Sequence, residues 1–410
     1  MPFELPDTLV LMMMAVLLLP LLASAGIIAA TRELLFDWAG PVATAVMAGV
    51  FGIALIGGVM WMGDPPEQPL HVLVPWIPTP GTDASYLPLG IFIDDLTIAM
   101  VVMVTGVSAL VHLYSIGYMK DDPRKNWFFA YLLLFTFSML GIVLANSIIM
   151  LFVFWELVGL TSYLLIGFWF ENKGPQAACL KAFVMNRIGD AGLLIGLGIL
   201  FVQLGGTTLL PAAEGGVFGA TKDALASGGM SIENNPPIWL TVAGVCLFFG
   251  AIGKSAQFPL HTWLPDAMEG PTPVSSIVHS ATMVAAGVYL TARLTPILTP
   301  DAHLFVATIG LITLVIAAAM AMVMTDIKRV LAYSTISQLG YMILGVGCGA
   351  YVFALYHLIT HAFFKCCLFQ CAGSVIHAAH HEQDMTQYGG LAKKMPVTAA
   401  AYGVCTLAIA

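Results

Sequence analysis

Long apolar runs separated by short polar segments are the dominant pattern along the chain. A helix that crosses a membrane needs about 20 predominantly apolar residues. Runs of this kind lie at residues 8–30, 42–62, 93–116, 127–145, 147–170, 180–204, 238–257, 272–293, 303–325, 329–347, 350–377 and from 396 onward. The pattern predicts an all-α polytopic membrane protein with about twelve transmembrane helices in this chain. Because the last run reaches Ala410 without a polar end, we expect the sequence to be a fragment.

Composition supports a membrane protein rather than a soluble one. Hydrophobic residues make up 59% of the 410 residues and charged residues only 9%, whereas soluble domains have roughly 25% charged residues. So few polar side chains cannot cover a soluble globule of this size, but helices in lipid need no such cover. The net charge is -8 and no basic tail or arm is present, so we expect no nucleic-acid partner.

Lys and Arg are distributed unequally between alternate loops. One set of loops carries ten of them: Arg32, Lys120, Arg124, Lys125, Lys173, Lys181, Lys328, Arg329, Lys393 and Lys394. The other set carries only Lys222 and Arg293. Because positive loops face the cytoplasm, residues 1–7 and the loops 63–92 and 205–237 are predicted on the non-cytoplasmic side. This bias favours a bacterial inner membrane over a mitochondrial one.

Eight of the ionisable residues inside the predicted spans are candidates for a functional role. They are Glu156, Arg187, Asp190, Lys254, His279, His357, His361 and Lys365. A Lys or Asp at the centre of a span costs about 2.5–3.5 kcal/mol, so such residues face a protein interior or water and mark ion or proton pathways. The sequence contains no dinucleotide-binding glycine motif and no iron–sulfur or haem ligand pattern. Proton relay is therefore the chemistry that these residues indicate.

The segment that follows Lys254 cannot continue as a helix. Pro259, Pro265, Pro271 and Pro273 follow within twenty residues, and each proline removes a backbone donor and clashes with the preceding turn. A broken helix leaves backbone polar groups that persist in a membrane only inside protein or beside water. We therefore expect Lys254 at a hydrated break, where a nearby carboxylate such as Glu156 would control its proton.

The polar residues of the predicted sixth span and its neighbours also have structural interpretations. Glu156 and Lys254 could form a structural ion pair between helices. Arg187 and Asp190 are three residues apart on one helical face, and such a pair could neutralise itself and join two spans. His279 could be a hydrogen-bonded residue of the core.

A stripe of polar residues follows the predicted eleventh span. His357, His361 and Lys365 are four residues apart and therefore share one face of a helix. Two histidines at this spacing could bind a metal, but a third ligand is not evident and the lysine would repel a cation. We expect no metal site there.

Several motifs resemble those of a known family. The stretches are "FVFWELVGLTSYLLIGFW", "KAFVMNRIGDAG", "GKSAQFPLHTWLPDAMEGPTPVSSIVHSATMVAAGVYL", "DIKRVLAYSTISQLGYM" and "HLITHAFFKCCLF". Together they look like the distal antiporter-like membrane subunits, called chain L or subunit 5, of proton-pumping NADH:quinone oxidoreductase (respiratory complex I). The resemblance covers nearly all of the chain from about residue 90 onward.

The resemblance implies an architecture and roles for individual residues. It implies three N-terminal helices in 1–126, a first five-helix repeat in 127–295 (helices 4–8) and an incomplete, inverted second repeat in 296–410 (helices 9–12). In this family Glu156 and Lys254 match the pair that controls proton loading, with Lys254 on the discontinuous seventh helix. The other matches are Asp190 on the sixth helix, Lys365 between two half-channels, and His279, His357 and His361 along the hydrated axis.

The resemblance also implies partners and leaves alternatives. We expect no cofactor in this chain, with FMN, iron–sulfur clusters and quinone in partner subunits. Expected partners are other membrane-arm subunits, especially the adjacent antiporter-like subunit, and the lipid bilayer. The same fold occurs in multi-subunit sodium/proton antiporters, membrane-bound hydrogenases and inorganic-carbon uptake complexes, which are the alternative functions. A structural membrane scaffold with no transport role is a further alternative.

Overall fold

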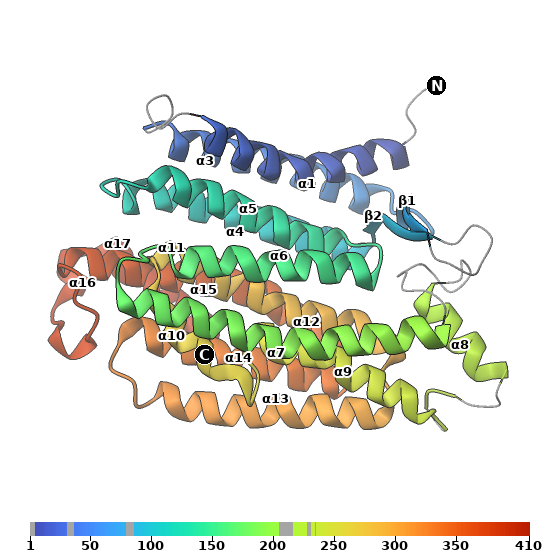
Figure 1. Ribbon diagram of the computed structural model, residues 1–410. Helices are drawn as coiled ribbons and strands as arrows, with labels where there is room; N and C mark the ends of the chain where they lie inside the picture. Colours follow the sequence, from blue (N-terminus) through green and yellow to red (C-terminus); the bar gives the residue numbers. More distant parts are fainter. Residues whose placement is uncertain (1–4, 31–36, 79–85, 205–215, 228–230, 234) are drawn as a thin grey trace.

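The computed structural model describes the chain apart from residues 1–4, 31–36, 79–85, 205–215, 228–230 and 234. The helices run roughly alongside one another and form a single bundle (Figure 1). Within the described residues, ten helical segments are long and apolar enough to cross a membrane. Two shorter apolar helices, α9 (Ile238–Lys254) and α17 (Pro396–Ile409), bring the set to the twelve spans that the sequence predicts.

The first half of the chain supplies the spanning helices α1 (Leu5–Ala29), α3 (Ala39–Gly63), α4 (Asp95–Tyr118), α5 (Lys125–Leu144), α6 (Ile148–Ile166) and α7 (Lys173–Leu204). Polar residues between the apolar runs start two of these helices. Asp94 accepts a hydrogen bond from the backbone of Thr97, and Ser147 accepts one from the backbone of Met150. Such capping satisfies amide groups that the first helical turn leaves unpaired.

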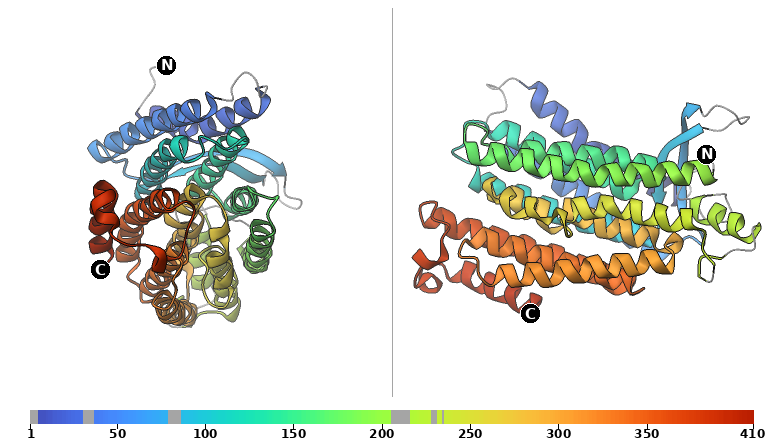
Figure 2. Two further views of the ribbon diagram at one scale, coloured as in Figure 1. Left: turned by 90° about the vertical axis from the view of Figure 1, so that its left-hand side faces the viewer. Right: turned by 60° about the horizontal axis from the view of Figure 1, so that its bottom comes forward.

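The second half adds α13 (Pro300–Ala321), α14 (Ile327–Gly347), α15 (Tyr351–Ala378) and the short α16 (Leu391–Lys394) before α17. The N-terminal helices α1 and α3 lie along one edge of the bundle, away from α16 and α17 (Figure 2). The expected limits 127–295 and 296–410 of the two repeats stay predictions.

The seventh span is interrupted directly after Lys254. Residues 255–271 form the turns η2 (Leu260–Thr262) and η3 (Ala267–Glu269) around the short helix α10 (Trp263–Asp266). The Trp263 indole donates a hydrogen bond to the Gly253 carbonyl oxygen over 3.0 Å, which satisfies a carbonyl at the end of α9. The expected discontinuity is therefore present where the prolines predict it.

The eighth span is present where the sequence predicts it, at 272–293, but it is also interrupted. It consists of α11 (Thr272–Ser280) and α12 (Met283–Leu294), which continues into the turn η4 (Thr295–Ile297). Thr282 leaves helical geometry and its hydroxyl bonds to the Ile277 carbonyl oxygen over 2.7 Å. The sequence has no proline or glycine at this point, so it carries no breaker signal.

Two of the expected loops contain regular structure. The 63–92 loop contains an antiparallel hairpin of β1 (Leu70–Pro78) and β2 (Tyr86–Ile93), in which Leu70 pairs with Ile93. The 205–237 loop contains α8 (Val217–Ser227), although part of that loop lies outside the described residues. The hairpin and α8 lie at one end of the bundle and α16 lies at the other (Figure 1). Which end faces the cytoplasm stays a prediction, and Arg32 lies outside the described residues.

Candidate functional site

Four ionisable side chains from α6, α7 and α9 form two ion pairs inside the bundle. Glu156 on α6 pairs with Arg187 on α7. Lys254 at the end of α9 lies with its Nζ 3.6 Å from Oδ2 of Asp190, also on α7. Because Arg187 and Asp190 are three residues apart on one helix, α7 supplies one partner to each pair.

These pairs correct two expectations. Glu156 was expected beside Lys254, and mutual neutralisation of Arg187 and Asp190 was left open as a structural alternative, but the structure exchanges the partners. Close contact between α7 and α9 is the physical reason. A Cβ atom added at Gly189 would lie 2.8 Å from the Phe249 carbonyl oxygen, so only glycine lets the two backbones touch. This contact brings Asp190 onto Lys254.

The two pairs differ in burial. The side chains of Lys254 and Asp190 are 1% and 3% exposed, whereas those of Glu156 and Arg187 are 23% and 34% exposed. We call the first the inner pair and the second the outer pair. Neither Nζ of Lys254 nor Oδ2 of Asp190 has a hydrogen-bond partner in the part of the chain that the structure describes. Buried polar atoms are normally hydrogen-bonded, so the hydrogen-bonding capacity of the inner pair is incompletely satisfied.

Trp155 and Gly159 on α6 complete the surroundings of the inner pair. The Trp155 indole donates a hydrogen bond to Oδ1 of Asp190 over 2.6 Å. The Nζ of Lys254 lies 6.0 Å from the centre of the Trp155 ring, and it would lie 2.6 Å from a Cβ atom at Gly159. Sequence reasoning missed both residues, because a buried tryptophan and a helical glycine are also typical of ordinary core packing.

His279, which lies in the last turn of α11 before the break in the eighth span, is fully buried. Neither ring nitrogen has a hydrogen-bond partner among the described residues, which argues against an ordinary hydrogen-bonded core histidine. Its ring centre lies 6.2 Å from that of Trp263 and 6.1 Å from that of Phe369 on α15. Since Trp263 also bonds to Gly253 beside Lys254, His279 is one aromatic residue away from the inner pair.

The expected stripe on α15 is present and contacts α14. Lys365 is fully buried and donates to the Ser334 hydroxyl over 2.8 Å and weakly to the Leu331 carbonyl oxygen. His357 shares a 2.7 Å hydrogen bond with the side chain of Gln338. The ring centres of His357 and His361 are 6.2 Å apart. In contrast to Lys254, Lys365 has no carboxylate partner among the described residues.

The structure contains no group of three His, Cys, Asp or Glu side chains with metal-binding geometry within the described residues. It does contain a buried cation that the sequence analysis assigned to a loop. Lys328 lies in the first turn of α14, is 3% exposed, and donates to the Gly270 carbonyl oxygen over 3.0 Å. Its position at the very start of an apolar run made it look like a loop residue.

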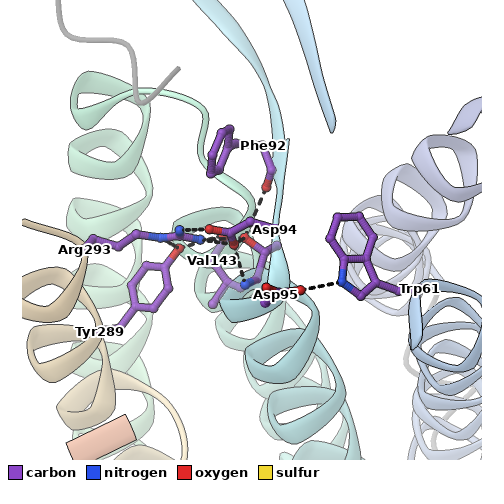
Figure 3. A network of polar contacts seen from close by, with 8 residues as sticks. Trp61, Phe92, Asp94, Asp95, Val143, Tyr289 and Arg293 are labelled. Atoms are coloured by element: carbon purple, nitrogen blue, oxygen red, sulfur yellow. Dashed lines mark hydrogen bonds and ion pairs between the residues drawn. The ribbon is translucent and has the colours of Figure 1, made fainter. Parts of the chain in front are cut away.

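Arg293 is a second cation that the sequence analysis assigned to a loop. It forms a bidentate ion pair with Asp94 at the hairpin end of the bundle, and its Nη2 also donates to the Thr97 hydroxyl over 2.6 Å (Figure 3). Its Nε donates to the Tyr289 hydroxyl, which in turn donates to the Val143 carbonyl oxygen. We call this network the Arg293 clamp.

The clamp changes the acidity of Asp94, which lies just before α4. Burial alone would raise the pKa of this carboxyl group. Hydrogen bonds and the positive charge of Arg293, together with hydrogen bonds from Thr97, outweigh burial and hold the pKa below its usual value. Asp94 is therefore held ionised at neutral pH.

Two family models match the chain. Residues 145–410 match the NADH:quinone oxidoreductase/Mrp antiporter transmembrane family, and residues 76–129 match the N-terminus of complex I chain 5. The chain belongs to the NADH:quinone oxidoreductase/Mrp antiporter family. This confirms the resemblance that the sequence motifs indicate.

Curated relatives of this antiporter-family chain carry complex I names. NADH-quinone oxidoreductase subunit L of Rhodobacter capsulatus is 47% identical over 376 residues, which cover 88% of this chain and 51% of the relative. Subunit L of Mycobacterium tuberculosis is 46% identical over 378 residues, covering 91% of this chain and 57% of the relative. The antiporter-family chain spans about half the length of these curated relatives.

Solved structures support the same fold. The structure of the Mrp complex from Dietzia sp. DQ12-45-1b matches with a TM-score of 0.79 at 32% identity, covering 98% of this chain and 40% of that chain. The membrane-bound sulfane sulfur reductase, an archaeal respiratory membrane complex, matches with a TM-score of 0.77 at 21% identity, covering 98% and 77%. The second match supports the fold alone.

Proposed function

We propose that the antiporter-family chain is part of a proton-translocating membrane subunit of NADH:quinone oxidoreductase. The names of its curated relatives support this assignment. Protons would move through a hydrated row of buried groups. The row comprises Glu156, Arg187, Asp190, Lys254, His279, His357, His361 and Lys365.

The inner pair carries this proposal. A purely structural ion pair in a water-poor interior is stable only when hydrogen bonds satisfy its remaining atoms. The inner pair is almost fully buried, yet Nζ of Lys254 and Oδ2 of Asp190 lack hydrogen-bond partners among the described residues. Buried polar atoms of this kind are commonly satisfied by internal water, and water beside titratable groups is what proton transfer requires.

The surrounding residues have roles that follow from their contacts. Lys254 takes up and releases the proton, and Asp190 stabilises the ammonium form. The outer pair, Glu156 on α6 with Arg187 on α7, shifts the charge around Lys254. His279 lies between the inner pair and α15, from which His361, His357 and Lys365 continue the row.

The redox chemistry belongs to partner subunits under this proposal. FMN, iron–sulfur clusters and quinone would reside there, and the adjacent antiporter-like subunit would deliver the conformational signal. We place the chain in a bacterial inner membrane with its N-terminus on the non-cytoplasmic side, because of the Lys and Arg bias of its loops.

Sodium/proton antiport is the second candidate, since the Mrp match combines 32% identity with a TM-score of 0.79. A subunit of a related hydrogenase or inorganic-carbon uptake complex is a further alternative. Transport that requires sodium and continues without NADH oxidation would favour the antiporter. Transport that requires NADH oxidation and tolerates sodium removal would favour complex I.

The test uses the full-length protein in its membrane complex with Lys254→Ala and Glu156→Gln. Proton pumping into inverted vesicles and NADH:quinone reductase activity are measured together with complex assembly. We expect Lys254→Ala to abolish most pumping by this subunit, and Glu156→Gln to reduce it, while the complex still assembles. Lys222→Ala on α8, an exposed cation, is the control. Unchanged pumping in both variants would favour the scaffold alternative.

A further inference from the structure

The carboxylate of Asp190 is held from two sides by different chemistry. Oδ2 faces the ammonium of Lys254 at 3.6 Å. Oδ1 accepts a 2.6 Å hydrogen bond from the indole N–H of Trp155. Trp155 is fully buried on α6, so its ring cannot move aside without repacking the bundle. The indole therefore fixes which oxygen of Asp190 is available to Lys254.

The same helix face also limits where the ammonium lies. Nζ of Lys254 is 6.0 Å from the Trp155 ring centre, and Gly159 lies one helical turn farther along α6. Because glycine has no Cβ atom, the ammonium fits against the α6 backbone at this point. Trp155 and Gly159 together define the position of one proton-carrying group and the orientation of its partner.

We propose that Trp155 is a positioning residue for proton exchange at Lys254, an inference that rests on the function proposed above. Its N–H holds Oδ1 away from the lysine, so the ammonium meets one carboxylate oxygen at a distance longer than a hydrogen bond. Without this N–H the carboxylate can rotate and offer both oxygens to Lys254. The tighter pair would retain the proton, and transfer through the row would slow.

The size of the effect follows from the bond that is lost. A hydrogen bond to a charged group contributes about 1.5–3 kcal/mol, which corresponds to roughly a ten- to hundredfold change in an equilibrium. Other charges near this site are those of the outer pair, Glu156 on α6 and Arg187 on α7. Both remain in place when only the indole N–H is removed.

The chain offers a control in another tryptophan–aspartate hydrogen bond, in which the tryptophan is buried and the aspartate is exposed. Trp61 on α3 donates to Oδ1 of Asp95 over 2.7 Å, near the Arg293 clamp (Figure 3). Its geometry is close to that of the Trp155 bond, but it is not in contact with the inner pair. If the loss of any indole–carboxylate hydrogen bond were enough to impair pumping, the same loss would therefore appear at position 61 as at position 155.

The experiment replaces the indole nitrogen by sulfur in the full-length protein within its complex. Benzothienylalanine introduced at position 155 by nonsense suppression keeps the ring shape and removes the N–H donor. We expect about a tenfold loss of pumping by this subunit, a shifted pH profile of pumping, and unchanged thermal stability of the complex. The same replacement at position 61 should leave pumping and its pH profile unchanged. Tryptophan inserted at position 155 by the same suppressor should restore both.

Three outcomes would overturn the inference. The first is unchanged pumping and an unchanged pH profile with benzothienylalanine at position 155. The second is an equal loss at positions 155 and 61. The third is failed assembly both with this residue and with 4-fluorotryptophan, which keeps the N–H, because that result would indicate a packing role. The proposed function would fail separately, through normal pumping by Lys254→Ala and Asp190→Asn.

Discussion

Two ion pairs of this chain, one partly and one almost fully buried, join an aspartate to a cation, and they differ in how completely their atoms are hydrogen-bonded. In the Arg293 clamp, both oxygens of Asp94 meet the guanidinium, which also bonds to Thr97 and Tyr289 (Figure 3). In the inner pair, Lys254 and Asp190 stand 3.6 Å apart and each has an atom without a hydrogen-bond partner among the described residues.

Under the proposed function, this difference distinguishes a structural ion pair from one that takes part in proton transfer. A guanidinium is always protonated and its planar fork satisfies a carboxylate with two bonds, whereas a lysine ammonium is a point charge that can lose its proton when buried. The Arg293 clamp uses a guanidinium at the end of the bundle, where it joins α12 to α4. The inner pair uses a lysine ammonium inside the bundle. The two pairs also differ in burial, since the side chains of Arg293 and Asp94 are 9% and 23% exposed and those of Lys254 and Asp190 only 1% and 3%.

Breaking the clamp should have the largest effect on stability. Arg293→Ala leaves the Asp94 carboxylate largely buried without its partner, and removing one partner of a buried pair costs about 3–5 kcal/mol. Thermal unfolding of the purified complex in lipid nanodiscs measures this loss. A loss below about 1 kcal/mol, the range of exposed pairs, would mean that the clamp is not structural.

Crowding the inner pair should affect transport more than stability. In Gly159→Ala the new methyl group would lie 2.6 Å from Nζ of Lys254, the mobile end of a long side chain, so the ammonium moves and the helix stays. We expect roughly a tenfold loss of pumping. This corresponds to a change of about 1.4 kcal/mol, or one pKa unit, in the free energy of protonating the displaced ammonium. Gly198→Ala on α7, where a Cβ atom meets nothing within 4 Å, is the control. Equal pumping by both variants would contradict the transport role.

Acid should weaken the clamp in a defined pH range. Because the pKa of Asp94 is below its usual value, the clamp's contribution to stability is fully present above the ordinary aspartate pKa of about 4. It is lost as the pH falls through the folded-state pKa, where Asp94 becomes protonated. The unfolding temperatures of the wild type and of Arg293→Ala should therefore converge as the pH falls below about 4. If the difference between the two unfolding temperatures stayed constant down to pH 3, the predicted loss of the clamp's stabilisation in acid would be contradicted.

Removing one hydroxyl from the clamp should have the smallest effect. Thr97→Ala deletes the hydroxyl that bonds to Arg293 and Asp94 but leaves the ion pair, so we expect a loss of about 1 kcal/mol and normal pumping. Thr105→Ala on the same helix is the control, because within the described part of the chain its hydroxyl bonds only to carbonyl oxygens of its own helix. A larger loss of stability than that of Arg293→Ala would show that the clamp depends on the threonine.

Sequence alone was enough to predict the spans and most of the buried polar row. Apolar runs of the required length have few alternatives to membrane helices, and an ionisable residue such as Lys254 is conspicuous in such a run. The break after Lys254 was predictable because proline has a direct effect on backbone geometry. The break at Thr282 was not, because no residue there is a helix breaker.

Partners of the charged residues could not be predicted from spacing. Which carboxylate meets Lys254 depends on the rotation and separation of α6, α7 and α9, and these depend on contacts such as that of Gly189 with Phe249. Arg293 and Lys328 were missed for another reason. Both lie at the ends of apolar runs, where a cation in a loop and a buried cation have the same sequence pattern.

The interruptions of the seventh and eighth spans also have an electrical consequence. A helix carries partial negative charge at its carboxyl end, and in an unbroken span that end lies at the membrane surface. Here α9 and α11 end inside the bundle, with Lys254 and His279 in their last turns. Two negative poles thus lie in the interior, each next to a side chain that can carry a proton, and both favour a positive charge passing between them.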